Sequence, residues 1–237
     1  MRNKKVFHFK KFSVHHDRSS MKVGTDGVLL GAWVDVSNCK NVLDIGMGSG
    51  LIALMLAQRT PDHVTIDGID ILQEDFQQAS ANFLASPWKD KLTAHHIALQ
   101  DFNPGYQYDC IVTNPPFFSN SLHPPGVKRQ VVRHTTSLTF DELLSSTLRL
   151  LTPAGGLNLI LPLTEGEQFI TAASEKGLYC NRIASFRTKA SKPVERLLLE
   201  LSFIEKAITL SEILLYNEAH IPSEEYRSLT AEFYINF

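Results

Sequence analysis

The four residues Asn114, Pro115, Pro116 and Phe117 are the part of the sequence best suited to direct chemistry. They follow the apolar run 108–113, which has the character of a buried strand. Two carbonyl oxygens in such a loop can accept the hydrogens of an exocyclic amine, while the aromatic ring stacks on the attached heterocycle. Each proline biases the preceding residue toward extended backbone and has no N–H to donate, so the loop is rich in acceptors. The pattern fits an amine-holding site and, equally, a proline-rich turn with a core phenylalanine.

The segment 44–50 joins a strand-like run to a helix-like run and has the sequence DIGMGSG. Its glycines Gly46, Gly48 and Gly50 permit a tight turn and let backbone N–H groups at a helix N-terminus approach a ligand. A dinucleotide fingerprint would need glycine at position 51, where this chain has leucine. The acidic residue Asp44 stands directly ahead of the glycines. The segment predicts a cofactor loop, and a glycine-rich turn without a ligand is the alternative.

Two further residue pairs follow the next two strand-like runs. Asp70 stands at a strand tip where an acidic residue commonly binds the ribose hydroxyls of an adenosine-bearing cofactor, and Ile71 can pack on the adenine. At the following tip, Asp101 can accept from the adenine amino group and Phe102 can cover the ring. Asp70 could instead cap a helix, and the second pair could form a turn. All four lie at the carboxyl ends of predicted parallel strands, where open α/β sheets bind ligands.

Apolar runs alternate with helical patterns along the chain, which predicts a parallel sheet with crossover helices. The predicted strands cover residues 41–45, 63–69, 92–99, 108–113 and 156–161, and the predicted helices cover residues 51–57, 73–84, 141–151 and 165–176. A short polar linker joins residues 179–187 to residues 196–203, so these form a hairpin with one antiparallel strand at the sheet edge. We expect an α/β fold with a mostly parallel seven-stranded sheet, an antiparallel edge hairpin and helices on both faces. Residues 205–237 are not placed by these patterns.

Composition favours a single folded domain over residues 1–237. The 43% hydrophobic and 20% charged content is ordinary for a globular protein. The three cysteines are widely spaced and form no CxxC pair, so we expect neither a disulfide framework nor a metal site. No run is long and apolar enough to span a membrane, and the basic N-terminus has no signal-peptide character, so a cytoplasmic location is expected.

Basic residues are clustered, although the formal net charge is only −2. One cluster opens the chain with Phe7, Phe9 and Phe12 interleaved, a second follows the Asn-Pro-Pro-Phe sequence, and a third spans 182–196. Such clusters suit phosphates and unstacked bases, and a solvated surface is the alternative. We expect the first two clusters to bind a polyanion, and their candidate members are Lys4, Lys5, Lys10, Lys11, Lys128, Arg129 and Arg133.

The acidic-Gly-x-Gly-x-Gly loop and the Asn-Pro-Pro-Phe sequence together resemble the sites of class I (Rossmann-like) methyltransferases that use S-adenosyl-L-methionine and act on planar amines. The predicted strand order is also similar to theirs. The segment 21–33, MKVGTDGVLLGAW, looks like the N-terminal motif of the bacterial tRNA1(Val) adenine-37 N6-methyltransferase family. The stretches 133–136 and 229–234 are similar to the same family, so the resemblance spans nearly the whole chain.

This resemblance implies roles for individual residues. Asp44 would orient the methionine end of S-adenosyl-L-methionine. Lys22, Thr25 and Asp26 would lie over the glycine loop, within a basic, cofactor-covering extension formed by residues 1–36. Thr25 or Asp26 could also cap a short helix.

The resemblance also implies the reaction. The target would be the N6 amine of adenosine 37, next to the anticodon, in tRNA1(Val), flipped out of its stack. The Asn114 side chain and the Pro115 carbonyl would accept the two N6 hydrogens, and Phe117 would stack on the base. No metal is implied, and the protein is expected to act as a monomer on the anticodon loop. The alternatives are methylation of guanine N2 in rRNA, methylation of a protein glutamine amide, and an RNA-binding module that has lost catalysis.

Overall fold

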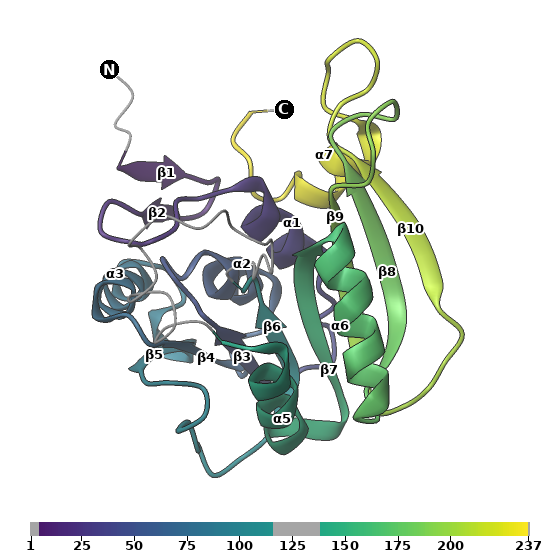
Figure 1. The fold of residues 1–237 in the computed structure, drawn as a ribbon. Helices are drawn as coiled ribbons and strands as arrows, with labels where there is room; N and C mark the ends of the chain where they lie inside the picture. Colours follow the sequence, from purple (N-terminus) through teal and green to yellow (C-terminus); the bar gives the residue numbers. More distant parts are fainter. Residues whose placement is uncertain (1–4, 116–137, 237) are drawn as a thin grey trace, which may run out of the picture.

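A computed structural model of the protein describes residues 5–115 and 138–236. Eight strands form one sheet in the order β10-β8-β9-β7-β6-β3-β4-β5 (Figure 1). The strands are β3 (Asn41–Ile45), β4 (Thr65–Asp70), β5 (Leu92–His96), β6 (Tyr108–Thr113), β7 (Leu151–Pro162), β8 (Tyr179–Arg187), β9 (Arg196–Ser202) and β10 (Thr209–Leu214). Strand β9 runs antiparallel to both its neighbours, β7 and β8, and the other pairings in this sheet are parallel. Strands β3, β4 and β6 therefore end at one common edge.

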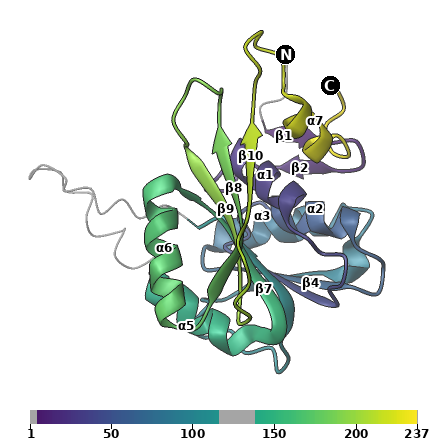
Figure 2. The same cartoon turned by 90° about the vertical axis from the view of Figure 1, so that its right-hand side faces the viewer.

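Helices cover both faces of the sheet (Figure 2). One face carries α5 (Phe140–Leu150) and α6 (Leu163–Glu175), and the other carries α1 (Thr25–Trp33), α2 (Leu51–Arg59) and α3 (Gln73–Leu84). Successive residues of a strand point to opposite faces. Val42 therefore joins the core beneath α1, α2 and α3, while Leu43 joins the core beneath α5 and α6.

Most predicted elements are confirmed. Strands β3 and β6 and helix α3 have the predicted bounds, although β5 is shorter and β7 is longer than expected. The expected count of seven strands is wrong, because β10 adds an eighth strand parallel to β8. The β8–β9 hairpin therefore lies inside the sheet and not at its edge. Strand β10 was not predicted from the sequence, because residues 209–212 are exposed and have no alternating apolar pattern.

The residues that precede α1 pack against the core on the α1, α2 and α3 side of the sheet. Two short strands, β1 (Val6–His8) and β2 (Ser13–His15), form an antiparallel hairpin. Phe9 and Phe12 are 4% and 6% exposed, and their rings stack with centroids 4.7 Å apart. The expectation that these phenylalanines meet unstacked bases is therefore wrong for Phe9 and Phe12, because the protein core already covers both rings.

The C-terminal residues, which the sequence left unplaced, return to this hairpin after β10. A short helix, α7 (Glu224–Thr230), precedes the contact. The backbone N–H of Lys10 donates to the carbonyl of Phe233 at 2.8 Å, and the Lys10 ammonium donates to the carbonyl of Ala231 at 2.7 Å. Gln58 of α2 donates to the carbonyl of Glu232 at 3.1 Å. The segment thus joins the β1–β2 hairpin to α2.

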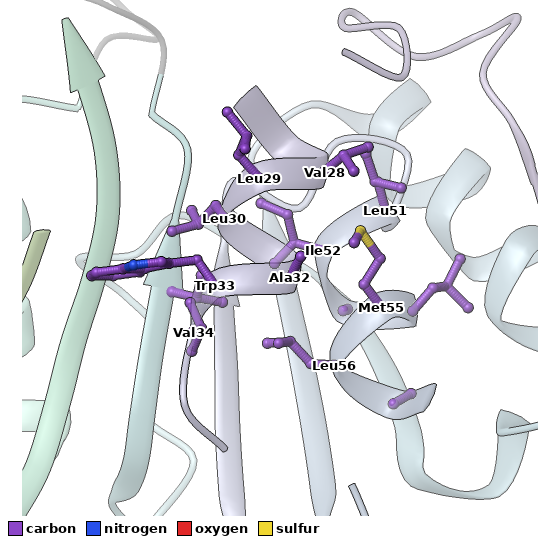
Figure 3. Packing of buried hydrophobic residues seen from close by; sticks show 14 of the residues in the cluster. Val28, Leu29, Leu30, Ala32, Trp33, Val34, Leu51, Ile52, Met55 and Leu56 are labelled. Atoms are coloured by element: carbon purple, nitrogen blue, oxygen red, sulfur yellow. The ribbon is translucent and has the colours of Figure 1, made fainter. Parts of the chain in front are cut away.

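Helix α1 lies close against α2 because glycines face the contact. A Cβ atom on Gly31 would lie 2.8 Å from the Sδ atom of Met55, and one on Gly27 would lie 3.0 Å from a methyl group of Leu51. Figure 3 shows Ile52 of α2 among the buried side chains between the two helices. This close approach places the first turn of α1 beside the start of α2, where the glycine loop ends.

Candidate active site

A cavity of about 290 Å³ lies where three separate parts of the chain meet. Its lining comes from the segment 21–27, from the glycine loop with the start of α2, and from Asn114 after β6. The lining contains the predicted site residues Lys22, Thr25, Asp26, Gly46, Gly48 and Asn114. The structure therefore brings together the N-terminal motif, the glycine loop and Asn114, which are far apart in the chain.

The glycine loop has the left-handed backbone that its composition predicts. Gly46, Gly48 and Gly50 have φ angles of 67°, 53° and 79°, a region that side chains other than glycine rarely occupy. The N–H of Met47 donates to the carbonyl of Ile69 at 3.1 Å, which holds the loop against the end of β4. The loop is thus fixed in a form that leaves its surface open toward the cavity.

Asp44 in β3 is completely buried, and its two oxygens have different surroundings. Oδ2 accepts a hydrogen bond from the N–H of Ala53 at 3.1 Å, whereas Oδ1 has no partner among the described residues. Burial raises the pKa of the Asp44 carboxyl to about 7; the Ala53 N–H opposes this rise, and the negative charge of Asp70 adds to it. Asp44 does not line the cavity, so its expected contact with the cofactor stays a prediction. Buried polar atoms without partners are uncommon, and Oδ1 suits a group that donates hydrogen bonds or carries positive charge.

Asp70, the last residue of β4, also holds the glycine loop. Its Oδ2 accepts from the N–H of Gly48 and its Oδ1 accepts from the N–H of Leu72, each at 2.9 Å. Burial raises the pKa of Asp70, and these two backbone donors oppose the rise. The neighbouring Ile71 is 46% exposed and so offers free apolar surface beside the loop. Neither Asp70 nor Ile71 lines the cavity, and their expected contacts with ribose and adenine stay predictions.

Asp101 and Phe102 are not brought to the cavity lining. They belong to a turn, in which the N–H of Asp101 donates to the carbonyl of Ala98 at 3.1 Å. Phe102 is 5% exposed, and its ring centroid lies 5.2 Å from that of His95 in the core beneath α5 and α6. The core encloses most of this ring, and its expected contact with an adenine stays a prediction.

Asn114 extends from the end of β6 into the cavity wall. Its Oδ1 is buried and has no hydrogen-bond partner among the described residues. Thr113 before it donates from Oγ1 to the carbonyl of Ile45 at 2.9 Å, which fixes the end of β6 to the end of β3. Pro115 is buried. The remaining predicted residues Phe117, Lys4, Lys128, Arg129 and Arg133 lie outside the described residues.

Asp26 has a partner that the sequence did not indicate. The guanidinium Nε of Arg196 donates to its Oδ2 at 2.9 Å, which joins the first turn of α1 to the start of β9. Arg182 and Arg187 of β8 likewise form ion pairs with glutamates of β9 and β10 at 2.9 and 2.8 Å. The arginines of the third basic cluster are therefore engaged in internal ion pairs. Their glutamate partners are brought by strand pairing, which the sequence pattern does not show.

The sequence also gave no role to three polar residues of α3. Asp75, Gln78 and Asn82 are only 1%, 5% and 2% exposed. Their spacing of three and four residues was the available signal, because it places all three on one helical face.

Neither a group of metal-binding side chains nor a membrane-spanning helix occurs among the described residues. Within residues 5–115 and 138–236, no three His, Cys, Asp or Glu side chains are grouped so as to hold a metal ion. No helix in these two ranges is long and apolar enough to cross a membrane.

Comparisons with known proteins identify the family of this chain. Residues 19–161 match the Methyltransferase small domain family. A tRNA1(Val) (adenine(37)-N6)-methyltransferase of Phocaeicola vulgatus is 44% identical over 233 residues, which is 97% of each chain. One of Vibrio vulnificus carries the same name and is 41% identical over 98% of this chain and 96% of its own.

Solved structures share the fold. One from Agrobacterium tumefaciens, described as a predicted O-methyltransferase, covers 88% of this chain and 96% of its own with a TM-score of 0.66 at 15% identity. The glycopeptide N-methyltransferase MtfA in complex with S-adenosyl-L-methionine covers 77% of this chain and 100% of its own, with a TM-score of 0.56 at 11% identity. From the full-length matches, this chain belongs to the tRNA1(Val) (adenine(37)-N6)-methyltransferase family.

Proposed function

We propose that this protein transfers a methyl group from S-adenosyl-L-methionine to the N6 amine of adenosine 37 in tRNA1(Val). The observation that carries the proposal is the buried, unpartnered Oδ1 of Asn114 on a cavity shared with the glycine loop. The names of relatives that match nearly the whole chain support the choice of substrate. We also propose a cytoplasmic location, which a tRNA substrate supports.

The described residues fit the cofactor. Oδ1 of Asp44 is a buried acceptor without a partner among the described residues, and residues 46–49 of the glycine loop line the cavity. When bound, S-adenosyl-L-methionine supplies an electrophilic methyl group. Gly46 and Gly48 would lie against it, Asp44 would favour its positive charge, and Lys22 would bind its carboxylate. Asp70 and Ile71 would hold its ribose and its adenine.

The substrate amine needs acceptors, and the end of β6 supplies them. The side-chain carbonyl of Asn114 and the backbone carbonyl of Pro115 would each accept one N6 hydrogen of the flipped adenine. Two such hydrogen bonds favour a pyramidal nitrogen, whose lone pair then points away from the acceptors and toward the methyl group. Alignment and electrostatics of this kind can supply most of the catalysis, so no catalytic His or Cys is required. The methylated nitrogen would then lose its surplus proton to water.

The tRNA would dock beside the cavity as a polyanion. Lys5, Lys10 and Lys11 are exposed on or beside the β1–β2 hairpin, and with Lys4, Lys128, Arg129 and Arg133 they form the proposed contact with the anticodon loop. Neutralising these residues should weaken RNA binding and reduce its salt dependence. If the dependence of RNA affinity on salt concentration does not change, these residues do not contact the RNA. We further propose that the protein acts as a monomer, which sedimentation of the active protein tests.

In the decisive experiment, the protein is incubated with labelled S-adenosyl-L-methionine and a transcript of tRNA1(Val). The matched control is the same transcript with adenosine 37 replaced by guanosine. We expect methyl incorporation into the first transcript only, recovered as N6-methyladenosine after digestion to nucleosides. Equal incorporation into both transcripts would contradict the proposed position.

The same assay separates the competing functions. Ribosomal RNA and a protein fraction are offered in parallel, and the product is identified by mass spectrometry. N2-methylguanosine in rRNA or methylglutamine in protein, with no label in tRNA, would replace the proposed substrate. Binding of the transcript with no transfer to any fraction would indicate an RNA-binding module without catalysis.

A further inference from the structure

We propose that Asp75, Gln78 and Asn82 of α3 form an anchor, here called the α3 anchor, that positions residues 21–26 on the cofactor cavity. This inference rests on the proposed use of S-adenosyl-L-methionine. None of the three side chains lines the cavity, so they would act as positioning residues and not as ligands.

The carboxylate of Asp75 is the strongest part of this anchor. Its Oδ1 accepts from the hydroxyl of Ser19 at 2.5 Å and from the N–H of Ser20 at 2.9 Å. Its Oδ2 accepts from the hydroxyl of Ser20 at 2.5 Å. Asp75 is 1% exposed, and hydrogen bonds to a buried charged group are among the stronger ones.

The other two side chains bind the backbone of the same segment. Gln78 accepts through Oε1 from the N–H of Arg18 at 3.2 Å. Asn82 accepts through Oδ1 from the N–H of His15 at 3.0 Å and donates through Nδ2 to the carbonyl of His15 at 2.8 Å. The α3 anchor therefore holds residues 15–20 at three successive points along one helical face.

This anchored segment is directly continuous with the cavity lining. Met21 and Lys22 line the cavity and follow immediately after Ser20. A Cβ atom on Gly48 would lie 3.6 Å from the Oγ of Ser19, so Ser19 stands beside the glycine loop. The N–H of Val23 donates to Nδ1 of His16 at 3.1 Å, which closes residues 16–23 into one loop.

Asn82 links this segment to the glycine loop itself. The same Nδ2 that binds His15 also donates to the carbonyl of Ser49 at 2.8 Å. One buried amide thus joins the glycine loop, which lines the cavity at Ser49, to the segment that leads to residues 21–27. Loss of the anchor should free residues 15–26 and weaken cofactor binding, while Asn114 and the substrate side of the cavity stay in place.

The experiment measures S-adenosyl-L-methionine binding by calorimetry and steady-state transfer to tRNA for Asp75→Ala and for the double variant Ser19→Ala/Ser20→Ala. The double variant removes the two hydroxyl groups that donate to Asp75, and it does so at residues that are less buried than Asp75. It therefore tests the anchor even if Asp75→Ala folds poorly. Glu74→Ala is the matched control, because Glu74 is an exposed carboxylate in the same first turn of α3.

We expect both anchor variants to raise the Kd and the KM for S-adenosyl-L-methionine about tenfold or more, a change of about 1.4 kcal/mol. We expect kcat at saturating cofactor to stay within about twofold, since the interaction lost is not specific to the transition state. Hydrogen exchange should quicken in residues 15–26 and not in β3 or β6. Combining Asp75→Ala with the double serine variant should add little, because both remove one set of contacts.

An unchanged Kd in the folded double variant, or an equal loss in Glu74→Ala, would overturn the anchor. A wild-type protein that binds S-adenosyl-L-methionine without methylating tRNA would contradict the proposed substrate and leave this test intact. A wild-type protein that does not bind the cofactor would overturn both proposals.

Discussion

Asp44 and Asp67 are buried carboxylates on the neighbouring strands β3 and β4, but their surroundings are opposite. Asp67 accepts from the hydroxyl groups of Tyr106 and Tyr108 at 2.6 and 2.8 Å and bonds to Nε2 of His95 at 2.8 Å. Burial acts to raise the pKa of Asp67, yet these hydrogen bonds outweigh it and hold the pKa below the ordinary value. Asp44 has one backbone donor, one unpartnered oxygen and a raised pKa.

The two carboxylates differ in how far the protein meets their hydrogen-bonding capacity. Asp67 belongs to a satisfied cluster that stabilises the fold, whereas Asp44 keeps an oxygen available for a ligand. A buried polar group normally finds its partners within the protein, as Asp67 does. Where partners are missing, as at Asp44 and Asn114, the fold bears a cost that binding can offset. Buried atoms of Gln58, Thr147 and Asn158 also lack hydrogen-bond partners among the described residues, and none of these residues lines the cavity. An unmet hydrogen bond therefore points to a ligand only where it coincides with the cavity and the glycine loop, as at Asn114.

The largest expected effect comes from Asn114→Ala. Removing the amide should lower methyl transfer about 100-fold or more, the scale seen when one preorganised polar group is lost from an active site. Cofactor affinity and melting temperature should change little, because Oδ1 has no protein partner to lose. Asn38→Ala, at an exposed position, is the control. Full activity of Asn114→Ala at saturating cofactor would contradict the assigned role.

The next effect concerns the satisfied cluster. Asp67→Ala should lower the free energy of unfolding by about 3 kcal/mol, because three donors around a buried charge lose their acceptor. Since the folded pKa is lowered, this stabilisation is fully present above the ordinary pKa of 3.8 and is lost as pH falls through the folded value. Urea unfolding between pH 3 and 7 measures it, with the exposed Asp90→Ala as control. A folded variant with weakened cofactor binding would break the proposed separation of roles.

A smaller effect follows from the raised pKa of Asp44. In the ligand-free protein this group binds its proton more tightly than in the unfolded chain, so its contribution to stability falls as pH rises from 3.8 to about 7. A cationic cofactor favours the charged carboxylate, so its affinity should rise toward pH 7, by at most about tenfold per pH unit, and then level off. Calorimetry across this range should show proton release on binding, and Asp44→Asn should abolish it. A flat pH profile in the wild-type protein would show that Asp44 does not meet the cofactor's charge.

The smallest expected effect comes from Tyr106→Phe. Tyr106 is 46% exposed, and Asp67 keeps its bonds to Tyr108 and His95 when the Tyr106 hydroxyl is removed. The loss in unfolding free energy should be about 1 kcal/mol, as for one ordinary hydrogen bond. Differential scanning calorimetry detects it, and a loss as large as that of Asp67→Ala would mean that the cluster acts as one unit.

Local patterns predicted the parts of the site that depend on backbone conformation. The glycines at 46, 48 and 50, and Asn114 after a buried strand, all have signals within a few residues of sequence. The segment 21–33 was identified only by resemblance, and the structure supplies the physical reason: Gly27 and Gly31 let α1 approach α2.

Features that depend on distant partners were not predictable. Arg196 looked like free positive charge until the fold brought helix α1, with Asp26 in its first turn, to the start of β9. Phe12 looked like a base-stacking ring until Phe9 and the core covered it. Strand β10 was not predictable for the same reason, because it pairs in parallel with β8, which is not its neighbour in sequence.

The contact between the β1–β2 hairpin and residues 231–233 has a consequence for biosynthesis. The Lys10 ammonium and the Ala231 carbonyl are 221 residues apart in sequence. A nascent chain therefore cannot complete the packing of its first strands until residues 231–233 have left the ribosome, and contacts of such long sequence separation form late. The β1–β2 hairpin is thus translated early but is among the last parts of this fold to reach its final place. We expect truncation before Ala231 to loosen the segment that leads to the cofactor cavity.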